Sequence, residues 1–158
     1  MKEEPNIIWG ILAVCTFAFS ATVRAVSPAP DGGYPGANTA EGQSSLLSLT
    51  TGTYNTALGW FSLKGDTTAS LNTAIGAGTL LTNTADENTA TGAAALLSNS
   101  TGDFNTATGA FALFKNTDGE ANTAIGAGAL FNNTIGNTNT ASGFEALYFN
   151  TRRNESRF

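Results

Sequence analysis

The chain has 158 residues, of which 12% are charged and none is His, and its formal net charge at pH 7 is −5. This acidic balance argues against nucleic acid as a partner, because nucleic acid binds basic surfaces. The 18 glycines and the frequent alanines bury little apolar area per residue, which argues against a thick globular core and favours a thin, repetitive structure.

Residues 1–25 have the features of a secretory signal peptide. The apolar run IIWGILAVCTFAF covers residues 7–19, and it is short for a membrane-spanning helix, which needs about 20 residues. Small residues predict cleavage after Ala25, with a cut after Ser20 as the alternative. An uncleaved anchor or a buried helix would also fit the run. We expect an exported protein, extracellular or at the cell surface, that meets the membrane only through this segment.

Residues 26–37 form a linker rich in Pro and Gly, VSPAPDGGYPGA. Prolines at this density continue neither a helix nor a strand ladder, so we expect an extended segment with turns. The only Cys of the chain, Cys15, precedes this linker, so the exported part would contain no disulfide.

The phrase Asn-Thr-Ala-x-Gly then recurs seven times, at steps of 17, 17, 16, 17, 17 and 17 residues. A fixed period of this kind indicates a repeat architecture. Position one of the repeat is Asn38, Asn55, Asn72, Asn88, Asn105, Asn122 and Asn139. Position five is Gly42, Gly59, Gly76, Gly92, Gly109, Gly126 and Gly143.

Position nine of the repeat is always Leu, and position eight is always small. The leucines are Leu46, Leu63, Leu80, Leu96, Leu113, Leu130 and Leu147. A unit of 17 residues is too short for a helical pair or a propeller blade, but it suits one coil of a β-solenoid with short strands and tight turns. We predict an all-β solenoid, or β-roll, of about seven coils over residues 38–151, followed by a polar tail over 152–158.

Stacked coils place identical residues above one another, about 4.8 Å apart. We expect Ala at position three and Leu at position nine to face inward, and Thr at position two and the residue at position four to face outward. The Asn column would join coils through its amides. The remaining apolar residues exceed what a narrow coil can bury, so we expect another chain to cover some of them, unless the coil is wide enough to hold them.

These repeats resemble the head repeats of trimeric autotransporter adhesins, a family of exported bacterial surface proteins. NTAIGAGAL at residues 122–130 and NTALGWFSL at residues 55–63 carry the resemblance. It implies a left-handed β-roll, a homotrimer, and a host or matrix surface as the ligand. The period here is longer than that of the family. The coiled-coil stalk and membrane barrel of the family are not seen in this sequence, so cell anchoring is not carried over.

No pattern here predicts catalysis, a cofactor or a metal site. We expect the acids that follow the signal segment to share no one position of the repeat, whereas calcium-binding solenoids repeat Asp in every coil. The pairs Asp86–Glu87 and Asp118/Glu120 are therefore interpreted as solvated turn residues rather than as Ca²⁺ ligands.

The sequence therefore predicts a non-enzymatic, exported structural or adhesive module that acts through the outer faces of a rod. A segment of a phage-like or secreted fibre is the alternative. A more remote one is an ice-binding solenoid, suggested by the outward Thr column, although the mixed residues at position four argue against it.

Overall fold

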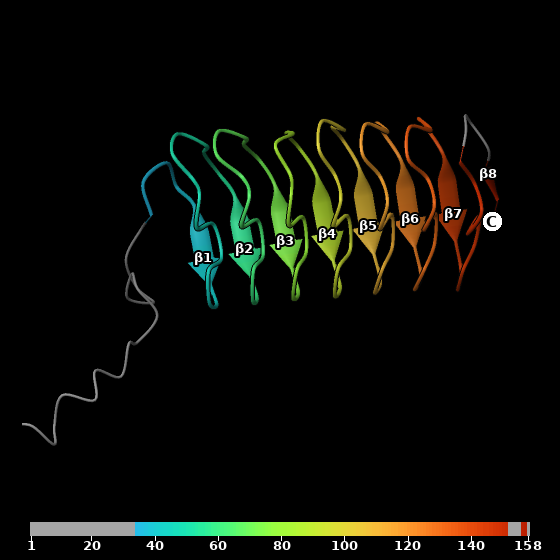
Figure 1. The fold of residues 1–158 in the computed structure, drawn as a ribbon, viewed down its shortest axis with the longest axis horizontal. Coiled ribbons are helices and arrows are strands. Elements are labelled where there is room, and N and C mark those ends of the chain that lie inside the picture. Colours follow the sequence, from blue (N-terminus) through green and yellow to red (C-terminus); the bar gives the residue numbers. More distant parts are fainter. Residues whose placement is uncertain (1–33, 152–155, 158) are drawn as a thin grey trace, which may run out of the picture. The chain divides into compact units, whose positions relative to one another are not determined.

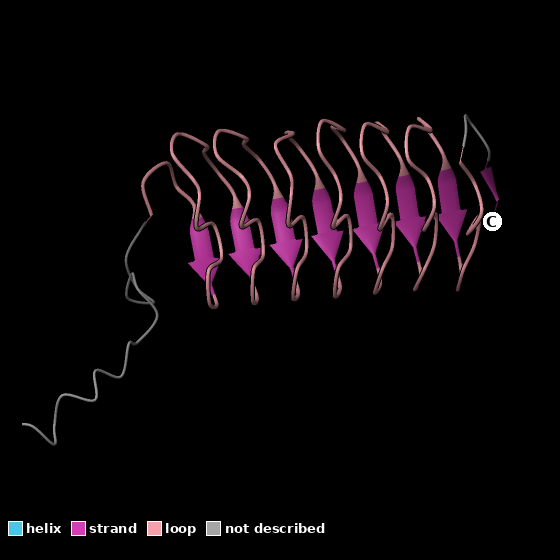
Figure 2. Cartoon of the chain, viewed as in Figure 1, coloured by secondary structure: helices cyan, strands magenta, loops and turns pink. Residues whose placement is uncertain are grey.

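The computed structural model of the chain describes residues 34–151 and 156–157. Parallel strands stack in chain order into one sheet, from β1 to β8 (Figure 1). They are β1 (Thr39–Glu41), β2 (Thr56–Leu58), β3 (Thr73–Ile75), β4 (Thr89–Thr91), β5 (Thr106–Thr108), β6 (Thr123–Ile125), β7 (Thr140–Ser142) and β8 (Ser156–Arg157). Turns and loops make up the rest of the described chain (Figure 2). The predicted fold class, an all-β solenoid, is confirmed.

Several predicted segments fall outside these residues. The signal peptide over 1–25 and most of the linker over 26–37 are among them, so both remain predictions. Of the polar tail over 152–158, the structure describes β8, which extends the sheet beyond the seventh repeat by pairing with β7.

Strand pairing keeps the repeats in register, with Thr beside Thr and Ala beside Ala from β1 to β7. The one 16-residue step does not disturb this register, since Ala74 pairs with Ala90. A loop absorbs the missing residue: Asn83 Nδ2 reaches the carbonyl two residues later, whereas Asn99 Nδ2 reaches the carbonyl three residues later.

The interior is built from the two positions that the sequence predicts. Every Ala of position three is buried, and the leucines of position nine are buried from the first coil to the sixth. Leu147 of the seventh coil is half-buried and packs against this core. Thr at position two and the residue at position four lie on the outer side of each strand, and none of them is buried, as expected.

The leucines of position nine adopt a left-handed backbone, with φ between 47° and 52°. A residue other than Gly in this region costs on the order of 1 kcal/mol, and no feature of Leu predicts it. Two features of the solenoid offset the cost. The Leu63 side chain is fully buried, and its N–H donates to the Thr79 carbonyl of the next coil at 3.0 Å. The other leucines from the first coil to the sixth are bonded in the same way.

Position five requires Gly for two reasons. Its φ lies between 118° and 133°, where a side chain is strained. A Cβ added to Gly109 would also lie 2.6 Å from the backbone carbon of Gly126 in the next coil. The predicted glycine turn is therefore also the place where successive coils come closest.

Each coil has a turn at either end of its strand. The turn of positions five to seven follows the strand and forms the lower edge in Figure 1, whereas the loop after position twelve precedes the next strand and forms the upper edge. A return segment of positions eight to twelve connects the two edges. The solenoid therefore presents the strand face, the return face and two edges to its surroundings.

Candidate functional site

The asparagines of position one form a buried column that bonds each coil to the next. Asn55 shows the pattern: its Oδ1 accepts the backbone N–H of Asn72 at 2.9 Å, and its Nδ2 donates to the Ala69 carbonyl at 2.8 Å. All seven of these asparagines are buried. The predicted Asn ladder is confirmed as a coil-to-coil connection, made chiefly from side chain to backbone.

A second buried polar column stands at position twelve, and sequence reasoning missed it. Asn99 Nδ2 donates to Asn83 Oδ1 at 2.7 Å, Asn116 Nδ2 to Asn99 Oδ1 at 2.8 Å, and Asn133 Nδ2 to Asn116 Oδ1 at 3.0 Å. Each amide also donates to a carbonyl of its own loop. The signal was available in the sequence, because Asn occupies this position in five of the seven copies.

Asp66 occupies position twelve in the second coil and is fully buried. Its Oδ1 accepts the backbone N–H of Ala69 at 2.9 Å, while Oδ2 has no hydrogen-bond partner. Burial raises the pKa of Asp66 to about 6, and the charge of Asp86 adds to this rise, while hydrogen bonds from Ala69, Asn72 and Thr67 oppose it. A carboxyl group in this setting is stabilised in its neutral form.

Acids do share one position of the upper loop, contrary to the sequence expectation. The Asp86 N–H donates to Asp103 Oδ1 of the next coil at 2.8 Å, and the Ala121 N–H, next to Glu120, donates to the Asp103 carbonyl at 3.0 Å. The short third coil had hidden this alignment, because counting from Asn72 places Asp86 one position early. Across residues 34–151 and 156–157, no group of three His, Cys, Asp or Glu side chains is placed to hold a metal ion.

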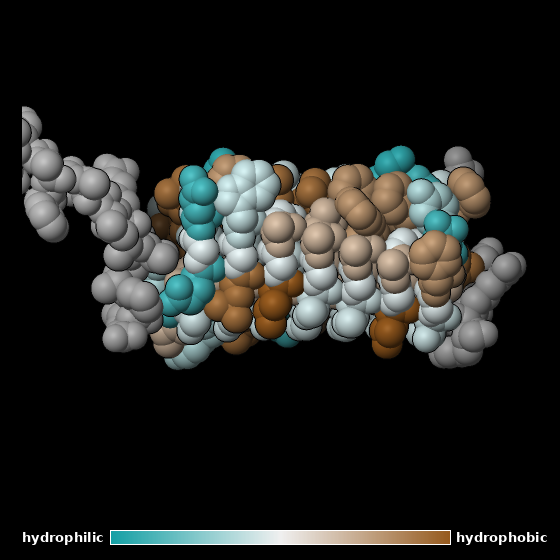
Figure 3. Space-filling view, turned by 90° about the horizontal axis from the view of Figure 1, so that it is seen from below, coloured by the Kyte–Doolittle hydropathy of each residue, from teal (hydrophilic) through white to brown (hydrophobic). Residues whose placement is uncertain are grey.

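Large apolar side chains lie exposed on both faces and both edges of the solenoid. They are Leu47, Tyr54, Trp60, Leu71, Ile75, Phe104, Phe111, Ile125, Ile135, Phe144 and Phe149. Figure 3 looks onto the lower edge, where brown apolar patches lie among pale and teal residues along the stack of coils. The coils therefore do not bury all of their large apolar residues. In that case the sequence predicts that another chain covers some of them.

The return face carries a stack of aromatic rings toward its C-terminal end. The ring of Phe114 stacks on Phe131 with centroids 5.0 Å apart, and Phe131 stacks on Tyr148 at 4.8 Å. These distances match the spacing of the coils. Two lysines of the same face lie over aromatic rings: Lys64 Nζ is 4.0 Å from the centroid of Phe61, a ring of the lower edge, and Lys115 Nζ is 5.5 Å from the centroid of Phe131.

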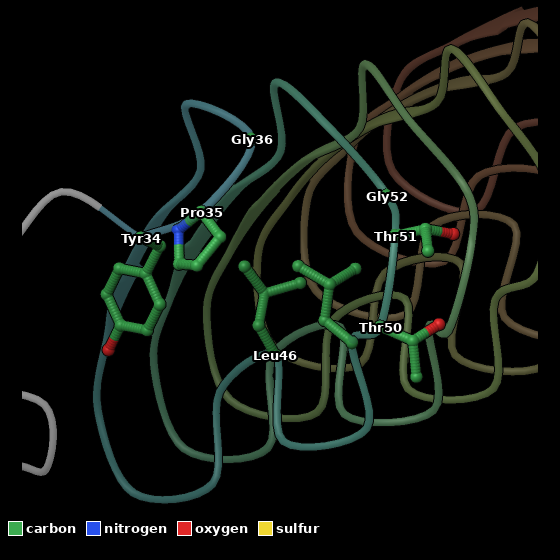
Figure 4. Close-up of a pocket in the computed structure, with 8 residues that line it drawn as sticks. Tyr34, Pro35, Gly36, Leu46, Thr50, Thr51 and Gly52 are labelled. Carbon is green, nitrogen blue, oxygen red and sulfur yellow. The ribbon is translucent and has the colours of Figure 1, made fainter.

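A shallow pocket lies at the N-terminal end of the described solenoid (Figure 4). Tyr34 and Pro35 line one side, and Leu46, Leu49 and the segment 50–52 line the rest. The segment of Tyr34 and Pro35 is hydrogen-bonded to the first coil, since Asn38 Nδ2 donates to the Pro35 carbonyl at 2.6 Å. The lining contains no charged side chain, so the pocket offers packing rather than chemistry.

Comparison of the chain with protein-family models, with curated proteins and with solved structures finds no match. The described residues also contain no helix with the length and apolar character needed to cross a membrane. The resemblance to adhesin heads therefore rests on the repeat motif alone.

Proposed function

We propose that this chain is an exported, non-enzymatic structural and adhesive module that needs no cofactor and binds a host or matrix surface through its outer faces. We further propose that it resembles adhesin heads in working as a homotrimer. The observation that carries the proposal is the set of exposed apolar side chains on a regular, internally bonded solenoid.

The solenoid suits a mechanical role, because its interior leaves few polar groups without a partner. The Asn column of position one and the parallel sheet bond each coil to its neighbours, and the column of position twelve adds bonds from the third coil to the sixth. Stability in such a structure comes from contacts between neighbouring repeats, so the repeat can extend without a thick core. The surface then varies freely at positions four, six, seven and ten.

Trimer formation is supported by the apolar residues that remain exposed. Contiguous apolar surface on a soluble protein usually marks an interface. Ile75 and Ile125 are exposed at position four of the strand face, where β4 and β5 carry Thr91 and Thr108. We assign the strand face to contacts between chains and leave the edges for the ligand.

The test is the solution mass of the purified 158-residue chain by sedimentation, followed by binding to immobilised matrix proteins and glycans. We expect the mass of three chains and saturable binding. A monomer would contradict the trimer, and binding no greater than to albumin-coated wells would contradict the adhesive role. Mass spectrometry of protein secreted by a bacterial host would show whether residues 1–25 are removed.

A matched pair of variants separates the strand face from the upper loop. Ile75→Thr combined with Ile125→Thr gives position four the residue that it already has in β4 and β5, and we expect it to weaken chain association. Ile135→Thr is the control, because Ile135 is an exposed loop residue and the first, second and fourth coils have Thr at its position. Equal association of both variants would argue against the strand face.

A further inference from the structure

Asp66 stands at position twelve directly before five coils that have Asn there. An Asn at position twelve donates one N–H to its own loop and accepts from the next coil, as Asn99 does with Gly102 and Asn116. A carboxylate has no proton to donate, and Asp66 instead accepts the Ala69 N–H. Its second oxygen is left without a partner inside the protein.

No cation of the described residues is placed beside this buried carboxyl. The nearest Lys in sequence, Lys64, is placed over the Phe61 ring. The groups that act on Asp66 are the Asn72 side chain, the backbone of Ala69 and Thr67, and the like charge of Asp86. The coil before it supplies Leu49 at the same position, so the N-terminal side of the column ends in an apolar residue. Ionised Asp66 is therefore a buried charge with incomplete hydrogen bonding, which is costly.

Because of the position of Asp66, the free-energy cost of its ionisation falls on one contact between coils. It lies in the second coil, directly before the coil that is one residue short. Coils in a solenoid contact only their neighbours, so a weak contact between the second and third coils affects the coils on its N-terminal side as a unit. Local opening of such a unit is a normal event below the free energy of global unfolding.

We propose that Asp66 acts as a proton-dependent latch: protonated, it holds the first two coils, residues 38–71, docked on the third, and ionised, it lets them open. The N-terminal end of the solenoid thus becomes looser as the pH rises from mildly acidic to neutral. This role is independent of the adhesive function proposed above.

The direction follows from linkage. The pKa of Asp66 is raised in the folded state to about 6, from about 3.9 in an unfolded chain. The stabilising contribution of the proton is complete below the unfolded value and is lost as the pH rises through the folded value. Between pH 5.0 and pH 7.5 these values give an opening equilibrium about tenfold larger at the higher pH.

Hydrogen exchange of the full chain, corrected for the intrinsic rate at each pH, tests the latch. We expect the protection of amides in β1 and β2 to fall about tenfold between pH 5.0 and 7.5, and to lie below the protection of amides in β5 and β6 at both pH values. Asp66→Asn supplies the residue found in the next five coils and should abolish the difference. Glu87→Gln, which removes an exposed carboxylate of the neighbouring coil, should keep it.

Equal protection of β1 and β2 at both pH values in the wild-type chain would overturn the proposal. The same would follow if the difference persisted unchanged in Asp66→Asn. Asp66→Leu is a second uncharged variant, with the residue that the first coil has at this position, Leu49. It too should lose the pH dependence. Protection in β1 and β2 that matched the protection in β5 and β6 would indicate that the chain opens as a whole, and it would also contradict a local latch.

Discussion

Asp66 and Asn83 occupy the same position in neighbouring coils, yet their hydrogen bonds to the loop run in opposite senses. Asn83 Nδ2 donates to the Ala85 carbonyl at 2.7 Å, whereas Asp66 Oδ1 accepts the Ala69 N–H at 2.9 Å. The amide continues the column to Asn99, but one oxygen of the carboxyl remains unpaired. The difference between an amide and a carboxyl group thus decides whether the side chain at this position has all of its hydrogen bonds.

The first prediction concerns global stability and pH. Because burial raises the pKa of Asp66 to about 6, its ionisation destabilises the folded chain above that pH. We expect Asp66→Asn to raise the free energy of unfolding at pH 7.5 by roughly 1–3 kcal/mol, with the gain shrinking toward pH 4. Chemical denaturation of both proteins across this pH range is the measurement, and a gain independent of pH would contradict it.

The second prediction concerns the middle of the column at position twelve. Asn116→Ala removes donors to Asn99 Oδ1 and the Gly119 carbonyl, and it removes one of the two acceptors of the Asn133 amide. We expect a loss of roughly 3 kcal/mol, because buried polar groups become unsatisfied. Asn137→Ala is the control, since Asn137 is exposed and accepts one N–H, that of Glu120. Similar losses in the two variants would argue against the column.

The third prediction compares two glycines with positive φ. In Gly109→Ala the new Cβ would meet the backbone of Gly126 at 2.6 Å, with φ at 130°, so we expect a loss of roughly 3 kcal/mol. In Gly78→Ala the nearest atom is 3.8 Å away, and the same position already holds Ala94 with φ at 55°. We expect that change to cost about 1 kcal/mol or less. Thermal unfolding followed by circular dichroism should rank them in this order.

The fourth prediction concerns the ice-binding alternative. The Thr column of position two is complete from β1 to β7, but the adjacent position four holds Leu58, Ile75 and Ile125 as well as Thr. A flat array of paired Thr columns is therefore missing, and we expect the purified chain to leave ice recrystallisation unchanged. Clear inhibition, absent in a variant with Thr89 and Thr106 replaced by Lys, would restore the alternative.

Much of this architecture is readable from the repeat. The fixed spacing of Asn, Ala, Gly and Leu predicts stacked coils, since only a constant coil length places identical side chains in register. The inward direction of Ala57 and the outward direction of Thr56 follow from the alternation of a strand. The surplus of apolar residues correctly predicted that some would remain exposed, as Phe144 does at 77%.

Apart from the repeated Leu of position nine, the return segment was harder to predict, because it contains no strand and so no alternation shows which of its residues point inward. The folded coil was needed to reveal that position twelve is buried, that Asp66 replaces an amide there, and that Leu takes a left-handed backbone at position nine. It also revealed where the short third coil loses its residue, and hence that Asp86 aligns with Asp103. The period and the strand could be derived from the chain alone, because local alternation and stacking are properties of the repeat. The burial of the return segment depends on how the whole coil closes, which no single repeat contains.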